Sequence, residues 1–325
     1  MQNKSLVYFG SPDFSAGVLK RLYENSKSSG VNISLVITQP DKPAGRGLRL
    51  RETPVKALAN KLNLEVFSFT KEKKGELIEK IRCIKPEYGV LYAFNEIIPE
   101  EILSLFPRGL WNLHPSILPL FRGPSPVAFP LILGLKETGV TIMKMEKGLD
   151  TGPVLAQNTR KIEPGHNHES LINLLSFDGY VLISNLLKQD KIVENNQDST
   201  KATYTKKIKK DDGFVPIETM QRLIKGEKVT VSSFPLISDY VMRNKAYTPG
   251  EYIDPEGFCS LARGLSPWPG IWTKVDFGGK TLRLKIFDVG YNPETKKIHI
   301  GSVQLEGRSP VSFPQWNNSY KIFSL

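Results

Sequence analysis

Short apolar runs alternate with amphipathic segments over the first half of the chain. The runs at 6–9, 33–37 and 88–92 have the length and the β-branched or aromatic content of buried strands. Further strands are expected at 65–69 and 109–113, and apolar residues at helical spacing mark helices at 14–23, 55–62, 77–81 and 170–188. Strands that alternate with helices predict right-handed crossovers. We therefore predict an α/β fold, with a Rossmann-like, mainly parallel sheet covered by helices on both faces.

The second half of the chain has a different pattern. Residues 195–213 are polar, mostly basic and free of apolar periodicity, which is typical of a linker. Beyond them, alternation at 228–234, 271–277, 281–289 and 296–305 predicts a small antiparallel β-barrel of the OB type. We expect a first domain at 1–194, a basic linker at 195–213 and a barrel domain at 214–325. The runs at 139–145 and 154–162 are expected to pair as an antiparallel edge of the first sheet.

Composition and charge indicate which partners, metals and cellular compartment suit the protein. The formal net charge of +11 favours a polyanionic partner such as nucleic acid, although the same charge also serves solubility alone. Only two cysteines occur, so neither a disulfide framework nor a thiolate metal site can be built, which suits a reducing compartment. His166 and His168 have no cysteine or carboxylate set around them, so we expect no metal. The sequence predicts no signal peptide and no membrane span, hence a cytoplasmic protein.

One predicted strand carries polar side chains where a ligand would bind. His114 ends the run at 109–113, and parallel sheets bind ligands at the carboxyl ends of their strands. Strand geometry places Asn112 and His114 on the same side, roughly 6–7 Å apart. A lone histidine is more often structural than catalytic. Asp150 lies between Gly148 and Gly152, in what is either a hairpin turn or a ligand loop. Together, an Asn, a His and an Asp can stabilise an oxyanion and move protons at an acyl centre.

The first strand-to-helix turn, Gly10-Ser11-Pro12-Asp13-Phe14, bears on cofactors. Ser11 is expected to cap the following helix, with Pro12 at the first helical position. The turn lacks the G-x-G-x-x-G pattern that brings a backbone close to a dinucleotide pyrophosphate. We therefore expect no NAD or NADP.

A long basic loop is expected after the second strand, at 38–56. It carries Lys42, Arg46 and Arg49 among glycines, and arginines in such a setting suit phosphate contacts. Loops of this length without secondary structure are usually functional or disordered. A mobile solvated loop is the alternative interpretation of the same residues.

The motifs together resemble the formyltransferase family that uses 10-formyltetrahydrofolate. Its hallmark is an Asn-x-His, a Ser-Leu-Leu-Pro loop and a distal Asp, and this chain has "NLHPSILPLFRG" followed by "ETGVTIMKMEKGLDTGPVL". The stretches "FGSPDF", "TQPDKPAGRG", "SPWPGIW" and "LEGRSPVSF" resemble the members that act on methionyl-tRNA. The likeness runs from the first strand to the last few residues. It departs at 93–95, where the family usually has "AYG", and is poor over 211–256.

The resemblance implies a transferase of translation initiation. A formyl group would pass from 10-formyltetrahydrofolate to the α-amino group of methionine on initiator methionyl-tRNA, without a metal, on a monomeric enzyme. The first domain would catalyse the transfer and the barrel would bind tRNA. The implied catalytic residues are Asn112, His114 and Asp150, with Asp150 orienting His114. The implied folate-binding residues are Phe94, Asn95, Ile97, Ser116, Ile117, Leu118 and Pro119. The implied tRNA-binding residues are Lys42, Arg46, Arg49, Lys206, Lys207, Lys209 and Lys210.

Two other interpretations remain open at this point. A sugar-nucleotide N-formyltransferase shares the Asn-His-Asp chemistry, but it has no use for the basic loop at 38–56. A non-catalytic tRNA-binding protein on the same scaffold would share the positive charge. Retention of Asn112, His114 and Asp150 argues against the second alternative.

Overall fold

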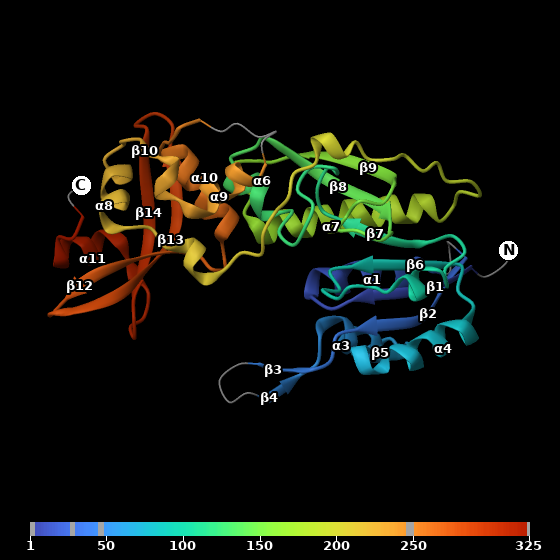
Figure 1. Ribbon diagram of the computed structural model, residues 1–325. Helices are drawn as coiled ribbons and strands as arrows, with labels where there is room; N and C mark the ends of the chain where they lie inside the picture. Colours follow the sequence, from blue (N-terminus) through green and yellow to red (C-terminus); the bar gives the residue numbers. More distant parts are fainter. Residues whose placement is uncertain (1–3, 27–29, 45–48, 245–249, 324–325) are drawn as a thin grey trace. The chain divides into compact units, whose positions relative to one another are not determined.

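A seven-stranded sheet organises the first half of the chain, in the order β5-β2-β1-β6-β7-β8-β9 (Figure 1). The computed structural model describes residues 4–26, 30–44, 49–244 and 250–323. The five strands β5, β2, β1, β6 and β7 run parallel to one another, and β8 is antiparallel to β7. The strands are β1 (Lys4–Gly10), β2 (Val31–Thr38), β5 (Val66–Ser68), β6 (Tyr88–Tyr92), β7 (Leu110–His114), β8 (Glu137–Lys144) and β9 (Val154–Lys161). The predicted Rossmann-like, mainly parallel sheet is confirmed, and β8 and β9 are neighbours at its edge, as expected.

Helices cover both faces of this sheet. Because side chains alternate along a strand, Val7 and Phe9 of β1 point to one face, where they pack with Leu77 of α4. On the other face, the Tyr8 hydroxyl donates to the Ser15 carbonyl of α1, and Tyr92 bonds to Ser176 of α7. Each large apolar side chain buried in these layers contributes roughly 1.5–3 kcal/mol to stability. The helices are α1 (Asp13–Glu24), α3 (Pro54–Lys61), α4 (Lys74–Ile84), α5 (Glu100–Leu103) and α7 (His168–Leu186), with the 3-10 turn η1 (Lys71–Lys73).

The turn after β1 differs from its prediction. Pro12 is the N-cap of α1, and Ser11 makes no cap to that helix. The Ser11 hydroxyl instead accepts hydrogen bonds from the Gln39 backbone N–H at 3.2 Å and from the Thr38 hydroxyl at 3.3 Å. Ser11 lies beside the end of β2, where Gln39 is the first residue after the strand. The turn therefore ties the carboxyl ends of β1 and β2 together.

The basic segment after β2 forms a hairpin, so the expectation of a loop without secondary structure was wrong. Strands β3 (Lys42–Ala44) and β4 (Arg49–Arg51) pair in the antiparallel sense. Helix α3 follows at once, capped by the Thr53 hydroxyl, which accepts from the Lys56 N–H at 3.1 Å. The Lys56 ammonium bonds to Asp41 at 2.8 Å, and this carboxylate raises the pKa of Lys56. The ion pair fixes the base of the hairpin.

An antiparallel sheet forms the centre of the second half of the chain. Its strands are β12 (Ile271–Phe277), β13 (Lys280–Asn292), β14 (Lys297–Leu305) and β15 (Val311–Ser312), in that order. Leu284 and Ile286 alternate as buried residues on β13, as the sequence pattern predicted. Gly278 and Gly279 have φ of 56° and 75°, which the tight turn between β12 and β13 requires. This sheet confirms the predicted C-terminal antiparallel domain and is consistent with a small barrel.

Five further helices were not predicted. They are α6 (Ala128–Ile132), α8 (Ile217–Ile224), α9 (Pro235–Arg243), α10 (Pro255–Leu265) and α11 (Phe313–Tyr320). The strand expected at 228–234 was largely wrong, because only β10 (Val229–Thr230) is extended, paired with β11 (Tyr252–Ile253), and a 3-10 turn η4 (Val231–Ser233) follows. The Thr230 hydroxyl bonds to the Ser232 hydroxyl at 2.9 Å, and such local hydrogen bonds compete with strand pairing.

Contacts within the chain define two compact units. The first comprises Met1–Arg122, Gly139–Arg160 and Ile172–Thr200, and the second comprises Gly123–Thr138, Lys161–Leu171 and Lys201–Leu325. The boundaries expected at 194 and 214 remain a prediction. The expected linker, 195–213, contains the 3-10 turns η2 (Ser199–Lys201) and η3 (Lys210–Gly213). Asn195 forms two backbone hydrogen bonds with Val154, at 2.8 and 2.9 Å. Among the described residues, none of the helices has the length and apolar character needed to cross a membrane.

Candidate active site

Asn112 and His114 occupy one face of β7, in the first unit. Leu110, two residues earlier on the same face, belongs to the core cluster of the sheet. Asn112 and His114 are 8% and 4% exposed, so both polar side chains are nearly withdrawn from water. Buried polar groups need partners, because an unpaired one costs several kcal/mol, on the order of 2–7. Their partners come from two separate loops.

Asp150 brings the first of these loops to β7. Its Oδ1 atom lies 3.4 Å from Asn112 Nδ2, and its Oδ2 atom lies 3.7 Å from His114 Nδ1. Asp150 has φ of +52°, a conformation uncommon for residues other than glycine. Because Asn112 is in the middle of β7, the Asp150 loop folds back over the face of that strand. The three residues singled out in the sequence therefore meet in one place.

Phe121 supplies the second partner of His114. The carbonyl of Phe121 lies 3.0 Å from His114 Nε2, and a carbonyl only accepts, so Nε2 carries a hydrogen. Phe121 has φ of +60° and is 5% exposed, which is a strained conformation for a bulky buried residue. This conformation turns the carbonyl toward the ring. It leaves the Nδ1 edge of His114 facing Asp150.

The loop at 116–119 is held from β8 and β9. The Thr141 hydroxyl of β8 donates to the Ser116 carbonyl at 2.6 Å and accepts from the Leu118 N–H at 3.1 Å. Gln157 of β9 donates to the Leu118 carbonyl at 3.0 Å. Ser116 and Leu118 are buried, whereas Ile117 and Pro119 are partly exposed. Neither Thr141 nor Gln157 was predicted from the sequence. Thr141 is a buried polar residue in the apolar strand β8, which was a usable signal, whereas Gln157 lies in the polar, exposed part of β9.

The predicted folate residues after β6 lie in different surroundings. Phe94 is 1% exposed, and its ring packs edge-on to Phe9 with 5.6 Å between ring centroids. Its side chain therefore belongs to the core. Asn95 is exposed with φ of +60°, and Ile97 is 91% exposed.

The predicted tRNA residues of the first unit are only partly described. Lys42 is exposed, and its ammonium donates to Gln39 Oε1 at 2.9 Å. Arg46 and the side chain of Arg49 lie outside the described residues. The structure therefore leaves the phosphate contacts of this hairpin as a prediction.

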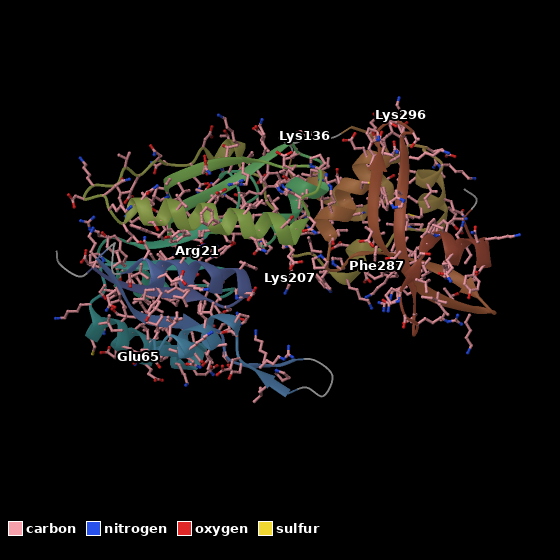
Figure 2. The ribbon with its side chains drawn as sticks, turned by 180° about the vertical axis from the view of Figure 1, so that it is seen from behind. Arg21, Glu65, Lys136, Lys207, Phe287 and Lys296 are labelled. Atoms are coloured by element: carbon pink, nitrogen blue, oxygen red, sulfur yellow. The ribbon has the colours of Figure 1, made fainter. Side chains whose placement is uncertain are left out.

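The four predicted lysines of the second unit are not equivalent. Lys206 pairs with Asp212 at 3.4 Å and with Asp239 at 3.2 Å. Lys207, labelled in Figure 2, is exposed, and so are Lys209 and Lys210. The charge of Lys206 is therefore used within the protein, while the other three face solvent.

The geometry around β7 suits acyl transfer. Asn112 presents an amide donor and His114 the Nδ1 edge of its ring on the same face of the strand, and Asp150 is a carboxylate within reach of both. The contacts of 3.4 and 3.7 Å are longer than good hydrogen bonds. Among the residues that the structure describes, no group of His, Cys, Asp and Glu is arranged to hold a metal ion.

Comparisons with known proteins agree with this chemistry. Residues 3–186 match the family described as formyl transferase. The methionyl-tRNA formyltransferase of Geotalea daltonii is 33% identical, over 98% of this chain and 96% of its own length. A solved methionyl-tRNA formyltransferase from Clostridium thermocellum has a TM-score of 0.55 at 17% identity, covering 93% of this chain and 98% of its own. A 4-N formyltransferase from Francisella tularensis has a TM-score of 0.58 at 14% identity, covering 87% and 97%.

The two solved structures bear on the fold alone, because their sequence identities are low. The alignment with the Geotalea daltonii protein covers nearly the whole length of both proteins, and it includes the second unit of this chain. The match thus extends well beyond the segment with the Asn-x-His strand and the Asp150 loop. The chain belongs to the methionyl-tRNA formyltransferase family.

Proposed function

We propose that this protein transfers a formyl group from 10-formyltetrahydrofolate to the α-amino group of methionine on initiator tRNA. The observation that carries the proposal is the convergence of Asn112, His114 and Asp150 in one buried site of the first unit. The nearly full-length likeness to methionyl-tRNA formyltransferases supports the choice of acceptor. The enzyme is proposed to act in the cytoplasm as a monomer.

Each of the three residues has a distinct task in the proposed reaction. When the methionine amine attacks the formyl carbon, a carbon–nitrogen bond forms and negative charge develops on the formyl oxygen. The Asn112 amide would donate to that oxygen, and so would Nδ1 of His114 in the imidazolium form of the ring, because Nε2 already donates to the Phe121 carbonyl. Asp150 would take the proton that the amine loses and return it, directly or through water, to the departing folate nitrogen. The bond from that nitrogen to the formyl carbon then breaks, and the proton count balances.

The proposed folate site uses the loops beside β6 and β7. Ala93 and Asn95 have φ of +53° and +60°, so two residues just after β6 are held in an uncommon conformation. Such strain occurs where a backbone is shaped for a ligand. Asn95 would offer polar atoms to the pterin, with Ile97, Ile117 and Pro119 as apolar walls. Ser116 and Leu118 would act from behind, by fixing the loop through Thr141.

A formyl-transfer assay tests the proposed function. The protein is mixed with 10-formyltetrahydrofolate and with one of three acceptors: initiator Met-tRNA, elongator Met-tRNA or an aminosugar nucleotide. We expect rapid formylation of the initiator Met-tRNA only. Transfer to the aminosugar nucleotide, or to no acceptor, would contradict the proposal.

The second unit is proposed to contact tRNA phosphates through Lys207, Lys209 and Lys210. Replacing all three with alanine should weaken tRNA binding at low salt and flatten the dependence of log Kd on log salt, by about 0.9 per lost phosphate contact. The measurement is filter binding of initiator tRNA over a series of salt concentrations. Lys206→Ala is the matched control, because Lys206 is already paired with Asp212 and Asp239 and should leave the slope unchanged. A wild-type slope in the triple variant would remove these lysines from the interface.

A further inference from the structure

A buried arginine and a glutamine connect the two loops that meet at His114. Arg122 directly follows Phe121, and its side chain is 1% exposed. Its guanidinium donates to Gln197 Oε1 from Nη2 at 2.8 Å and from Nε at 3.2 Å. Gln197 belongs to the polar segment after α7, 75 residues further along the chain. All of these atoms belong to the first unit.

The other end of the Gln197 amide holds the Asp150 loop. Its Nε2 atom donates to the Asp150 carbonyl at 2.9 Å and to the Gly152 carbonyl at 2.7 Å. An amide nitrogen has two hydrogens, and each is aimed at one of these carbonyls. Gln197 therefore joins the backbone of the Asp150 loop to the guanidinium beside Phe121.

Both partners of the His114 ring depend on this connection. Nε2 bonds to the carbonyl of Phe121, which is bonded covalently to Arg122, and Nδ1 faces the side chain of Asp150. We propose that Arg122 and Gln197 are positioning residues, which hold Asp150 and the Phe121 carbonyl in register around His114. The inference rests on the proposed function. Arg122 lies within the stretch "NLHPSILPLFRG", whereas Gln197 is 75 residues further along the chain.

The arrangement explains why a costly group is buried here. A buried guanidinium is a weak contributor to stability, since its desolvation offsets most of what its partners return. Its planar set of donors, however, gives a rigid two-point grip on a single oxygen acceptor. A displacement of about 1 Å at a reacting group costs roughly 10²-fold in rate, so rigidity at this point has a direct effect on turnover.

The Gln197→Glu variant distinguishes a loss of positioning, which lowers kcat, from a loss of folding, which lowers Tm. The introduced carboxylate still accepts from Arg122, so the buried cation keeps its partner. Its second oxygen faces the carbonyls of Asp150 and Gly152 and repels them, so the loop must move. We expect kcat to fall about 10²-fold, with little change in KM for either substrate and little change in Tm. Gln189→Glu is the control, because Gln189 is exposed in the same unit and the added charge is the same.

A double-mutant cycle with Asp150→Asn tests whether the effect passes through Asp150. If it does, Gln197→Glu should lower kcat far less in the Asp150→Asn background than in the wild type. Fully additive losses would show a general structural effect and overturn the inference. The double variant Arg122→Met/Gln197→Met tests the same positioning role without introducing a charge. The pair removes the buried cation together with the glutamine that accepts from it, so the double substitution leaves no unpaired buried charge, and kcat should remain low.

Crystal structures of the wild type and of Gln197→Glu give a readout that does not depend on the acceptor. The inference requires a shift of the Asp150 and Gly152 backbone away from its position over β7. An unmoved loop, or a wild-type kcat in Gln197→Glu, would contradict the positioning role even if the formyl transfer is established. If the wild type formylates no tRNA, the proposed function fails instead, and the crystallographic comparison still decides the role of Gln197.

Discussion

Replacing His114 with alanine is expected to lower kcat/KM for formyl transfer about 10³-fold. The variant loses the donor proposed to meet the formyl oxygen and the group that Asp150 orients, and each such contribution is typically worth about 10²–10⁴-fold. The tRNA contacts proposed for the second unit do not involve His114, so tRNA affinity should stay unchanged. Single-turnover transfer at saturating donor, together with filter binding of tRNA, measures the two quantities separately.

The stability of the His114→Ala variant must be measured beside its activity. The variant leaves the buried carbonyl of Phe121 without its donor at 3.0 Å, which costs about 1–3 kcal/mol. Urea unfolding therefore shows whether lost activity reflects lost fold. His299→Ala is a suitable control, because His299 is exposed on β14 of the second unit and should keep both activity and stability. If the folded His114→Ala protein keeps more than about a tenth of the wild-type rate, His114 has no such part in the chemistry.

Gly152→Ala is expected to reduce kcat about 10²-fold by displacing the Asp150 loop. A Cβ atom at this position would lie 1.8 Å from the backbone carbonyl oxygen of Lys144, a contact that no backbone tolerates. The loop must therefore shift. The Gly152 carbonyl, which accepts a hydrogen bond from Gln197 Nε2 at 2.7 Å, then moves away from that donor. Steady-state kinetics with initiator Met-tRNA would show the loss as a lower kcat.

Gly165→Ala is the matched control for that substitution. At Gly165, no heavy atom beyond the two neighbouring residues lies within 4 Å of the position where a Cβ would be added, so alanine should be accepted without movement. Gly152→Ala should also lower stability, because a strained backbone contact remains after relaxation. An unchanged kcat in a folded Gly152→Ala protein would mean that Asp150 does not have to stand beside His114 during turnover.

Local patterns were sufficient to predict most of the parallel sheet. The apolar run of β1 and the helical spacing in α1 are periodic over their own length, so they could be recognised without knowledge of the partners. Helix α10 was missed despite a local signal. Asp254 caps it by accepting from the Gly257 N–H at 2.8 Å, with Pro255 at the first helical position. The surrounding region lacked a clear pattern because its helices are short and irregularly spaced.

The candidate site was predicted as far as its short motif reaches. Asn112 and His114 are two residues apart, and Asp150 lies between glycines, so each has a recognisable setting in the sequence. Thr141 and Gln197 act through contacts with residues 25 and 75 positions away, and no sequence pattern shows such a pairing. Gln197 was further hidden in a polar segment that has the composition of a linker. Lys206 carried the same signal as Lys207, and only the fold distinguishes the paired lysine from the exposed one.

The edges of the seven-stranded sheet have a consequence for self-association. One edge strand, β5, has only three residues, and the other, β9, exposes polar and charged residues such as Asn158 and Lys161. Part of β9 is also covered by the backbone of Asn195. Short, charged or covered edges are poor templates for a strand from another molecule. The seven-stranded sheet is therefore poorly suited to joining edge to edge with the sheet of another copy.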